Sequence, residues 1–268
     1  MQSSPIVSAI ILNFRSPKDT VKCVQALQKQ TIAKDMEILV VDNGSEDESI
    51  GTFRNRFKDM KNVRIVETPE NLGYGKGNNF ALDHAKGEFV LIINPDNELE
   101  PSGLETMVKI MRKYDDIGIL APKLVYPDGT VRESYRRFPS IADILIKRSF
   151  LRKIFRKRLE HYLQSEKKLE GVHGTDWLAG ACLLIPRSLM KEMKGFDPRF
   201  FLFFEDTDLC RRCWKLGRKV MYCPSVEAKD SQERLSGGGF VPILFTKTGR
   251  MHIASAIRYF WKWKGVRK

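Results

Sequence analysis

Three acidic side chains lie close together directly after an aromatic run. Glu205, Asp206 and Asp208 follow residues 200–204, four of which are phenylalanines. Carboxylates beside apolar rings lose hydration and repel one another, and both effects raise the pKa of at least one of them. A carboxylate with a raised pKa suits a general base. Alternatively, acids are favoured in the first turn of a helix by its dipole; we expect Asp206 to face a site and Asp208 to cap the helix.

Asn94 and Asp96 flank a proline at the end of the apolar run 88–93. Their side-chain oxygens suit a divalent cation that also binds a diphosphate. The first position is a neutral amide, so a cation here would be held by fewer charges than in a pair of acids. The same residues also make a good turn between a strand and a helix. Of the two interpretations, we favour binding of a metal or a diphosphate.

Asn13 and Asp42 each end another apolar run. A carboxylate in the position of Asp42 can accept a hydrogen bond from the N3–H of uracil or thymine, a donor that cytosine lacks. The segment 42–45, Asp-Asn-Gly-Ser, also forms a turn without any ligand. Nucleobase binding and a turn that caps the next helix therefore both fit Asp42.

Alternating strands and helices must position these residues. Apolar runs predict strands at 7–13, 37–41, 63–66, 88–93 and 117–121, and periodic stretches predict helices at about 17–30, 46–58, 78–85 and 102–114. Residues 71–77 are expected to form a glycine-rich loop. The alternation predicts an α/β fold with a mostly parallel sheet. Ligands bind beyond the carboxyl ends of such strands, so the polar residues that end the runs should meet at one rim.

Two further stretches are basic and amphipathic. Residues 141–168 carry nine lysines and arginines against three acids. Residues 249–268 carry six lysines and arginines, no acid, and an aromatic cluster at 259–263. Basic and aromatic side chains together suit the surface of an anionic membrane, which is the interpretation we favour. The alternative is that the apolar faces pack on the protein and the charges are solvated.

The composition limits the classes of partner and the location that the protein can have. The 268 residues are 42% hydrophobic, and 46 Lys and Arg against 33 Asp and Glu give a net charge of +13. This excess predicts an anionic partner: nucleic acid, a phosphorylated small molecule or a membrane surface. No apolar run is long enough to span a bilayer, and the first residues do not resemble a secretory signal. The five cysteines favour reduced thiols in a cytosolic protein; Cys210 and Cys213 should pack on one helix face rather than bind zinc.

In order along residues 6–235, these features match one family pattern. The matching segments are VSAIILNF (7–14), VVDNGS (40–45), NLGY (71–74), NPD (94–96), GACLLI (180–185), GFDPRFF (195–201) and EDTDLCRR (205–212). The chain resembles the family 2 glycosyltransferases, which have the GT-A fold, and more closely their rhamnosyltransferase-like branch. Each motif alone is weak, but the ordered set is specific.

The resemblance implies how a donor would be held. Asn13, Phe14 and Asp42 would contact the nucleobase of a sugar nucleotide. Asp96, with Asn94, takes the place of the family's acidic motif that binds a metal, Mg²⁺ or Mn²⁺, and the diphosphate. The branch favours dTDP-rhamnose as donor, with UDP-sugars next.

The resemblance also implies the chemistry. Asp206 would be the general base, with Glu205 beside it, in a single inverting displacement at the anomeric carbon. The acceptor would be a hydroxyl of a cell-envelope polysaccharide or of its lipid-linked precursor. One departure concerns the metal: where relatives carry a histidine, this chain has Lys229. An ammonium there would neutralise the diphosphate directly, so both Lys229 and the neutral Asn94 put metal dependence in doubt.

These inferences predict a glycosyltransferase domain over 1–235, with donor binding in about 1–125 and the acceptor and catalytic part in about 126–235. The latter includes the basic insertion at about 141–168, and a basic aromatic helical tail follows at 236–268. The protein is expected to be cytoplasmic and peripheral on the inner face of the membrane.

Two other classes of protein also fit part of the sequence. A nucleic-acid-binding protein would suit the charge, but the basic segments contain no recognition motif, so we expect no nucleic-acid partner. A member that binds a sugar nucleotide without turnover would suit Asn94 and Lys229, but Glu205 and Asp206 favour an enzyme. We expect surface or packing roles for the histidines, which are His84, His161, His173 and His252.

Overall fold

The computed structural model describes residues 4–165, 170–231 and 246–266. Its strands are β1 (Val7–Asn13), β2 (Met36–Asp42), β3 (Val63–Glu67), β4 (Phe89–Ile93), β5 (Asn97–Leu99), β6 (Ile117–Val125), β7 (Tyr135–Arg136), β8 (His173–Gly174), β9 (Trp177–Leu178), β10 (Cys182–Pro186) and β11 (Lys219–Asp230). Its helices are α1 (Pro17–Gln28), α2 (Ser49–Phe57), α3 (Tyr74–Leu82), α4 (Gly103–Lys113), α5 (Ile141–Arg148), α6 (Leu151–Ile154), α7 (Arg156–Leu163), α8 (Arg187–Glu192), α9 (Glu205–Lys215) and α11 (Lys247–Lys262), with a 3₁₀ turn at Ala33–Asp35.

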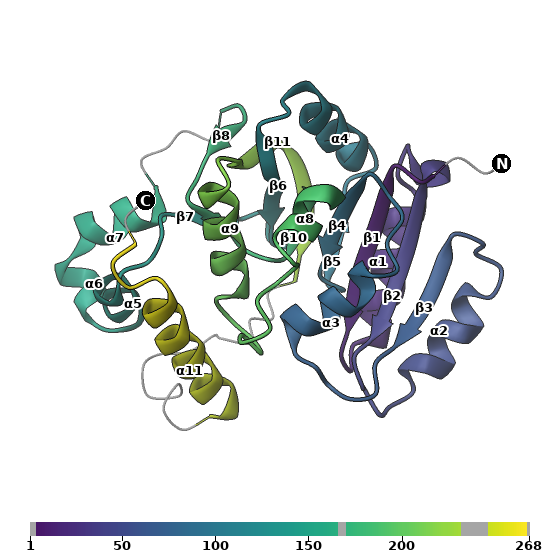
Figure 1. Ribbon diagram of the computed structural model, residues 1–268, viewed down its shortest axis with the longest axis horizontal. Coiled ribbons are helices and arrows are strands. Elements are labelled where there is room, and N and C mark those ends of the chain that lie inside the picture. The colour runs from purple at the N-terminus through teal and green to yellow at the C-terminus, as the bar shows by residue number, and fades with distance from the viewer. Residues whose placement is uncertain (1–3, 166–169, 232–245, 267–268) are drawn as a thin grey trace.

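A nine-stranded sheet runs through the described part of the chain (Figure 1). Its order is β3-β2-β1-β4-β10-β6-β11-β5, and β8 pairs with β11. The first four strands are parallel, and β11 is parallel to β6. β10 enters antiparallel between β4 and β6. The expected α/β fold with a mostly parallel sheet is therefore confirmed, and the antiparallel β10 is an addition to it.

Helices cover both faces of the sheet, which explains why its strands are nearly continuous apolar runs. On one face, α1, α2 and α4 contribute to a core that also contains alternate residues of β1, such as Ala9 and Ile11. On the other face, α3, α8 and α9 contribute to a second core that also contains Ile10 of β1. Cys210 and Cys213 of α9 are fully buried in this second core, as expected.

The glycine-rich segment differs from the expectation. The loop was expected to continue to Gly77, but α3 begins at Tyr74 and includes both Gly75 and Gly77. These glycines lie where the helix meets its neighbours: a Cβ on Gly77 would approach Leu12 within 2.6 Å, and one on Gly75 would lie 3.0 Å from the Phe196 side chain. Close packing thus uses glycine within the helix, where it usually signals a loop.

The two basic segments lie at the same end of the molecule, although they are far apart in sequence. The first forms three short helices, α5 to α7, and the second forms α11. Figure 1 shows all four at one end of the molecule, with β1 to β3 and α2 at the other. No helix in the described residues has both the length and the apolar content needed to cross a bilayer.

Candidate active site

A single large cleft connects the carboxyl ends of the strands with α11. Its volume is about 2400 Å³, and its lining includes Phe14, Asn94, Asp96, Glu205 and Asp206. Pockets for one small ligand typically have volumes of about 300–1,000 Å³. The cleft is therefore large enough for two substrates side by side.

Glu205 and Asp206 follow a strained turn. Phe203 and Phe204, directly before Glu205, both have positive φ angles, of 69° and 68°. Bulky residues rarely adopt this conformation, and it persists only where surrounding packing fixes it. Here Phe204 is buried in an aromatic cluster with Tyr259 and Trp263 from the C-terminal segment. The C-terminal segment therefore supports the turn that positions the acids.

Asp206 is well anchored. Its Oδ2 accepts a hydrogen bond from the backbone N–H of Gly180 (3.0 Å), and its Oδ1 accepts one from the N–H of Thr207 (2.6 Å). These bonds favour the charged form, but burial outweighs them and raises the pKa of Asp206 above its ordinary value. The result is a carboxylate with a fixed orientation and increased basicity.

Glu205 has a different environment. It is only 6% exposed, and its Oε2 has no hydrogen-bond partner among the described residues. Burial, and then the charge of Asp206, raises the pKa of Glu205 well above its ordinary value. Because Asp206 receives more hydrogen bonds, we infer that Asp206 releases its proton before Glu205. This order favours Asp206 as the base of the pair.

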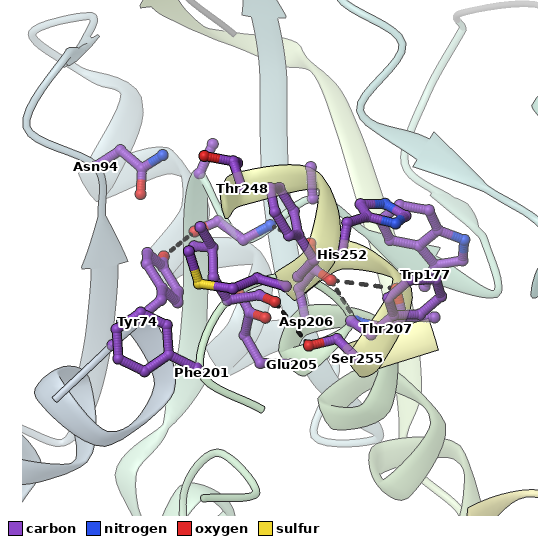
Figure 2. Close-up of a pocket in the computed structure, with 18 of the residues that line it drawn as sticks. Tyr74, Asn94, Trp177, Phe201, Glu205, Asp206, Thr207, Thr248, His252 and Ser255 are labelled. Atoms are coloured by element: carbon purple, nitrogen blue, oxygen red, sulfur yellow. Dashed lines mark hydrogen bonds between the residues drawn. The ribbon is translucent and has the colours of Figure 1, made fainter. Parts of the chain in front are cut away.

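Tyr74 connects the glycine-rich segment to the acids. Its hydroxyl donates to the carbonyl of Gly180, whose N–H donates to Asp206. Burial, and then Glu205 and Asp206, raises the pKa of Tyr74 well above its ordinary value, so the phenol keeps its proton. Figure 2 shows Tyr74 beside Phe201 at one side of the two acids.

Gly73 holds this connection in place, and we predict that Gly73→Ala destabilises the protein. Its φ of 80° and ψ of 177° are almost restricted to glycine. An added Cβ would lie 2.4 Å from the carbonyl oxygen of Phe201. We expect a loss of about 1–3 kcal/mol in the free energy of unfolding, measured by urea denaturation. Gly51→Ala, where nothing lies within 4 Å, is the control; equal stability of the two variants would contradict the prediction.

Asn13 and Asp42 meet as predicted but lie beneath the cleft surface. They are paired directly across β1 and β2, and Asn13 Nδ2 donates to Asp42 Oδ1 (2.7 Å). The same oxygen accepts from Ser45 Oγ (2.5 Å), and Asp42 is 5% exposed. Phe14 and Arg15 line the cleft at this position. The turn-forming role of Asp42 is thus visible in the structure, while its contact with a nucleobase stays a prediction.

Asn94 and Asp96 both line the cleft, as predicted. Among the described residues, no group of three or more His, Cys, Asp or Glu side chains could hold a metal ion. However, a Mg²⁺ ion is often bound by one carboxylate together with substrate phosphates and water. Burial raises the pKa of Asp96, although Ser231 donates a hydrogen bond to its Oδ2 (2.6 Å). A cation would offset this cost, so Asp96 and the amide of Asn94 fit an ion completed by the diphosphate.

Lys229 does not take the position expected for it. Along β11 the side chains of Ala228 and Asp230 are buried and that of Lys229 is exposed, because successive residues of a strand point to opposite sides. Lys229 is not among the described residues that line the cleft. The cation that does line the cleft here is Arg132, whose guanidinium pairs with Asp230 (2.6 Å).

The sequence did not reveal that both basic segments contribute to the cleft. Residues of α5 and α6 and one face of α11 line it. His252 of α11 packs against Phe203 and Phe204, with ring centroids 4.8 and 5.3 Å apart, and also lines the cleft. A packing role was expected for His252, but its place at the site was not. Only contacts between distant segments determine it.

Comparison with known proteins identifies the class. A family model described as "Glycosyl transferase family 2" matches residues 8–192. The chain belongs to this family of glycosyltransferases.

Among its relatives is the N-acetylglucosaminyl-diphospho-decaprenol L-rhamnosyltransferase of Mycobacterium tuberculosis, 30% identical over 218 residues, which are 75% of this chain and 68% of that protein. Rhamnosyltransferase WbbL of Escherichia coli is 25% identical over 70% of this chain and 69% of its own length.

Solved structures confirm the GT-A fold. GalNAc-T7 with UDP, GalNAc and Mn²⁺ matches 99% of this chain with a TM-score of 0.71 at 16% identity. Staphylococcus aureus TarS in complex with UDP matches 95% with a TM-score of 0.60 at 17% identity. The chain spans 49% of the GalNAc-T7 chain and 65% of the TarS chain. At these identities the likeness concerns the fold alone.

Proposed function

We propose that this glycosyltransferase transfers a sugar, with inversion, from a nucleoside-diphosphate sugar to a hydroxyl of a glycan or lipid-linked acceptor. The observation that carries the proposal is that Asp206, Asp96 and the strand-end rim line one cleft. In this proposal Asp206 takes the proton of the acceptor hydroxyl as its oxygen bonds to the anomeric carbon. The bond from that carbon to the donor diphosphate breaks in the same step.

The donor occupies the rim formed by the first 125 residues. Phe14 and the turn held by Asn13 and Asp42 lie at the nucleobase end, and Asn94 and Asp96 at the diphosphate. A divalent cation bound there would offset charge on the leaving diphosphate. We favour dTDP-rhamnose, then UDP-sugars, because rhamnosyltransferases are among the relatives.

The acceptor occupies the part formed by residues 126–235 and the C-terminal helix. We propose that the protein works at the inner face of a membrane. Several large apolar side chains of α5 to α7 and α11 are exposed beside basic residues: Phe150 (74%), Ile154 (65%), Ile257 (62%) and Trp261 (78%). Such a surface suits an anionic bilayer. A lipid-linked acceptor, as named for the mycobacterial relative, would be presented there.

A panel of nucleotide sugars, each with and without Mg²⁺ or Mn²⁺, tests the donor assignment. We expect one dTDP- or UDP-sugar to raise the melting temperature and to support glycosylation of a lipid-linked acceptor. The increase should be larger with the metal, because the carboxylate of Asp96 repels a diphosphate unless a cation lies between them. Asp96→Asn should remove the metal-dependent part while leaving binding of the free nucleoside. Absence of binding to every nucleotide sugar would contradict the proposal.

A further inference from the structure

Five cations line the cleft on its helical side. Arg152 and Lys153 belong to α6, and Lys247, Arg250 and Arg258 belong to α11. We call these five side chains the basic wall. The two segments that supply it are about a hundred residues apart in sequence, and the fold places both at the same cleft.

The basic wall has no counter-charge of its own. Residues 144–158 and 246–266 contain no Asp or Glu. None of the five cations forms an ion pair with another described residue, in contrast to the other cations of the cleft. Those pairs are Arg15–Glu46, Arg132–Asp230, Arg136–Glu133 and Lys147–Glu133. Like charges that converge on a cleft create a positive potential, which attracts an anion.

The position of the wall separates it from the donor diphosphate. Figure 2 shows Asn94 on one side of Glu205 and Asp206, and His252 of α11 on the other. α11 is fixed beside the acids, because Ser255 Oγ donates to the carbonyl of Leu202 (2.8 Å). The wall belongs to α6 and α11, whereas Asn94 and Asp96 follow β4, so an anion on the wall would lie on the helical side of the cleft.

We propose that the basic wall binds a phosphate or diphosphate group of the acceptor, at a site distinct from that of the donor diphosphate. This inference rests on the proposed function and specifies its acceptor. Arginine forms paired hydrogen bonds with phosphate oxygens, and the wall provides three guanidinium and two ammonium groups. The exposed Phe150, which lines the cleft and precedes α6, would contact an apolar chain attached to the phosphate. The acceptor is therefore a sugar linked through phosphate to a lipid.

Geranyl diphosphate, a short soluble lipid diphosphate, is the probe for this site. Its affinity is measured calorimetrically with the nucleoside diphosphate saturating, so that the donor site is filled. We expect Arg250→Ala/Arg258→Ala to weaken binding about tenfold or more, because hydrogen bonds between charged groups contribute about 1.5–3 kcal/mol each. Geraniol, which lacks the diphosphate, should bind both proteins equally weakly. Arg152→Glu/Lys247→Glu reverses one charge in each of the two segments and should weaken binding further.

The control is Arg156→Ala/Lys157→Ala, which removes two exposed charges of α7 that do not line the cleft. It should leave geranyl diphosphate affinity unchanged. Equal loss in this control, or unchanged affinity in both wall variants, would overturn the inference. So would wall variants that lose only binding to phosphatidylglycerol vesicles, which would assign the cations to membrane headgroups. Failure of this inference can be distinguished from failure of the proposed function. If the proposed function fails, no sugar nucleotide binds in the donor panel; if only this inference fails, sugar nucleotides bind but the wall variants keep their affinity for geranyl diphosphate.

Discussion

Asp206→Asn is expected to decrease kcat by about 10²–10⁴-fold, the usual contribution of a general base. The asparagine oxygen still accepts the hydrogen bond from Gly180, so the turn and the donor site should keep their geometry. Donor affinity should therefore change little. Steady-state rates with saturating donor and acceptor, with donor affinity measured by calorimetry, check both parts.

The pH profile tests the same residue. Burial raises the pKa of Asp206, and only its deprotonated form accepts a proton. The kcat of the native enzyme should thus be constant above this raised pKa and fall by about tenfold per pH unit below it. Asp206→Asn should abolish this acidic limb. Glu205→Gln is the comparison: a larger loss of kcat in Glu205→Gln than in Asp206→Asn would assign the base to Glu205.

Asp208→Ala is expected to be among the most destabilising substitutions. Its fully buried carboxylate pairs with Arg212 (2.8 Å) and Lys262 (2.6 Å) and accepts a hydrogen bond from Trp263 (2.9 Å). Asp208 was expected to cap the helix, but its contacts show that it also holds α9 against the C-terminal segment. Removing one partner of a buried charge network typically costs about 3–5 kcal/mol.

Urea denaturation of Asp208→Ala measures this loss. Glu67→Ala is the control, since it removes an exposed acid paired with Arg54; such surface pairs contribute about 0–1 kcal/mol. If the two variants had the same stability, the network would not hold the helix. Loss of kcat in folded Asp208→Ala would further show that the C-terminal segment supports the acids.

Much of the donor half could be predicted, because its strands are short apolar runs whose polar ends are local features. The meeting of Asn13 and Asp42 at one rim follows from such features, whereas their exact pairing is seen only in the structure. Their role in binding stays a prediction. The family motif predicted Lys229 beside the diphosphate, but the alternation of side chains along β11 places Lys229 on the exposed side of the strand. Buried Ala228 and Asp230 show which side faces the protein.

The acceptor half could not be predicted in the same way. Helical periodicity indicated that 141–168 and 249–268 are amphipathic, but not what their faces contact. Tyr259 and Trp263 pack on Phe204, while Trp261, between them in sequence, is exposed. Packing and exposure therefore occur on one helix: the packing interpretation holds for the face with Tyr259, and membrane contact by the exposed face stays a prediction. Such pairings between distant segments depend on the whole tertiary structure.

The support of the acids by α11 has a consequence for biosynthesis. Domains generally begin to fold from the N-terminus during translation, and the last strand of the sheet, β11, ends at Asp230, before α11 begins at Lys247. The turn before Glu205 and Asp206 therefore gains its packing against Tyr259 and Trp263 only after the whole sheet has been synthesised.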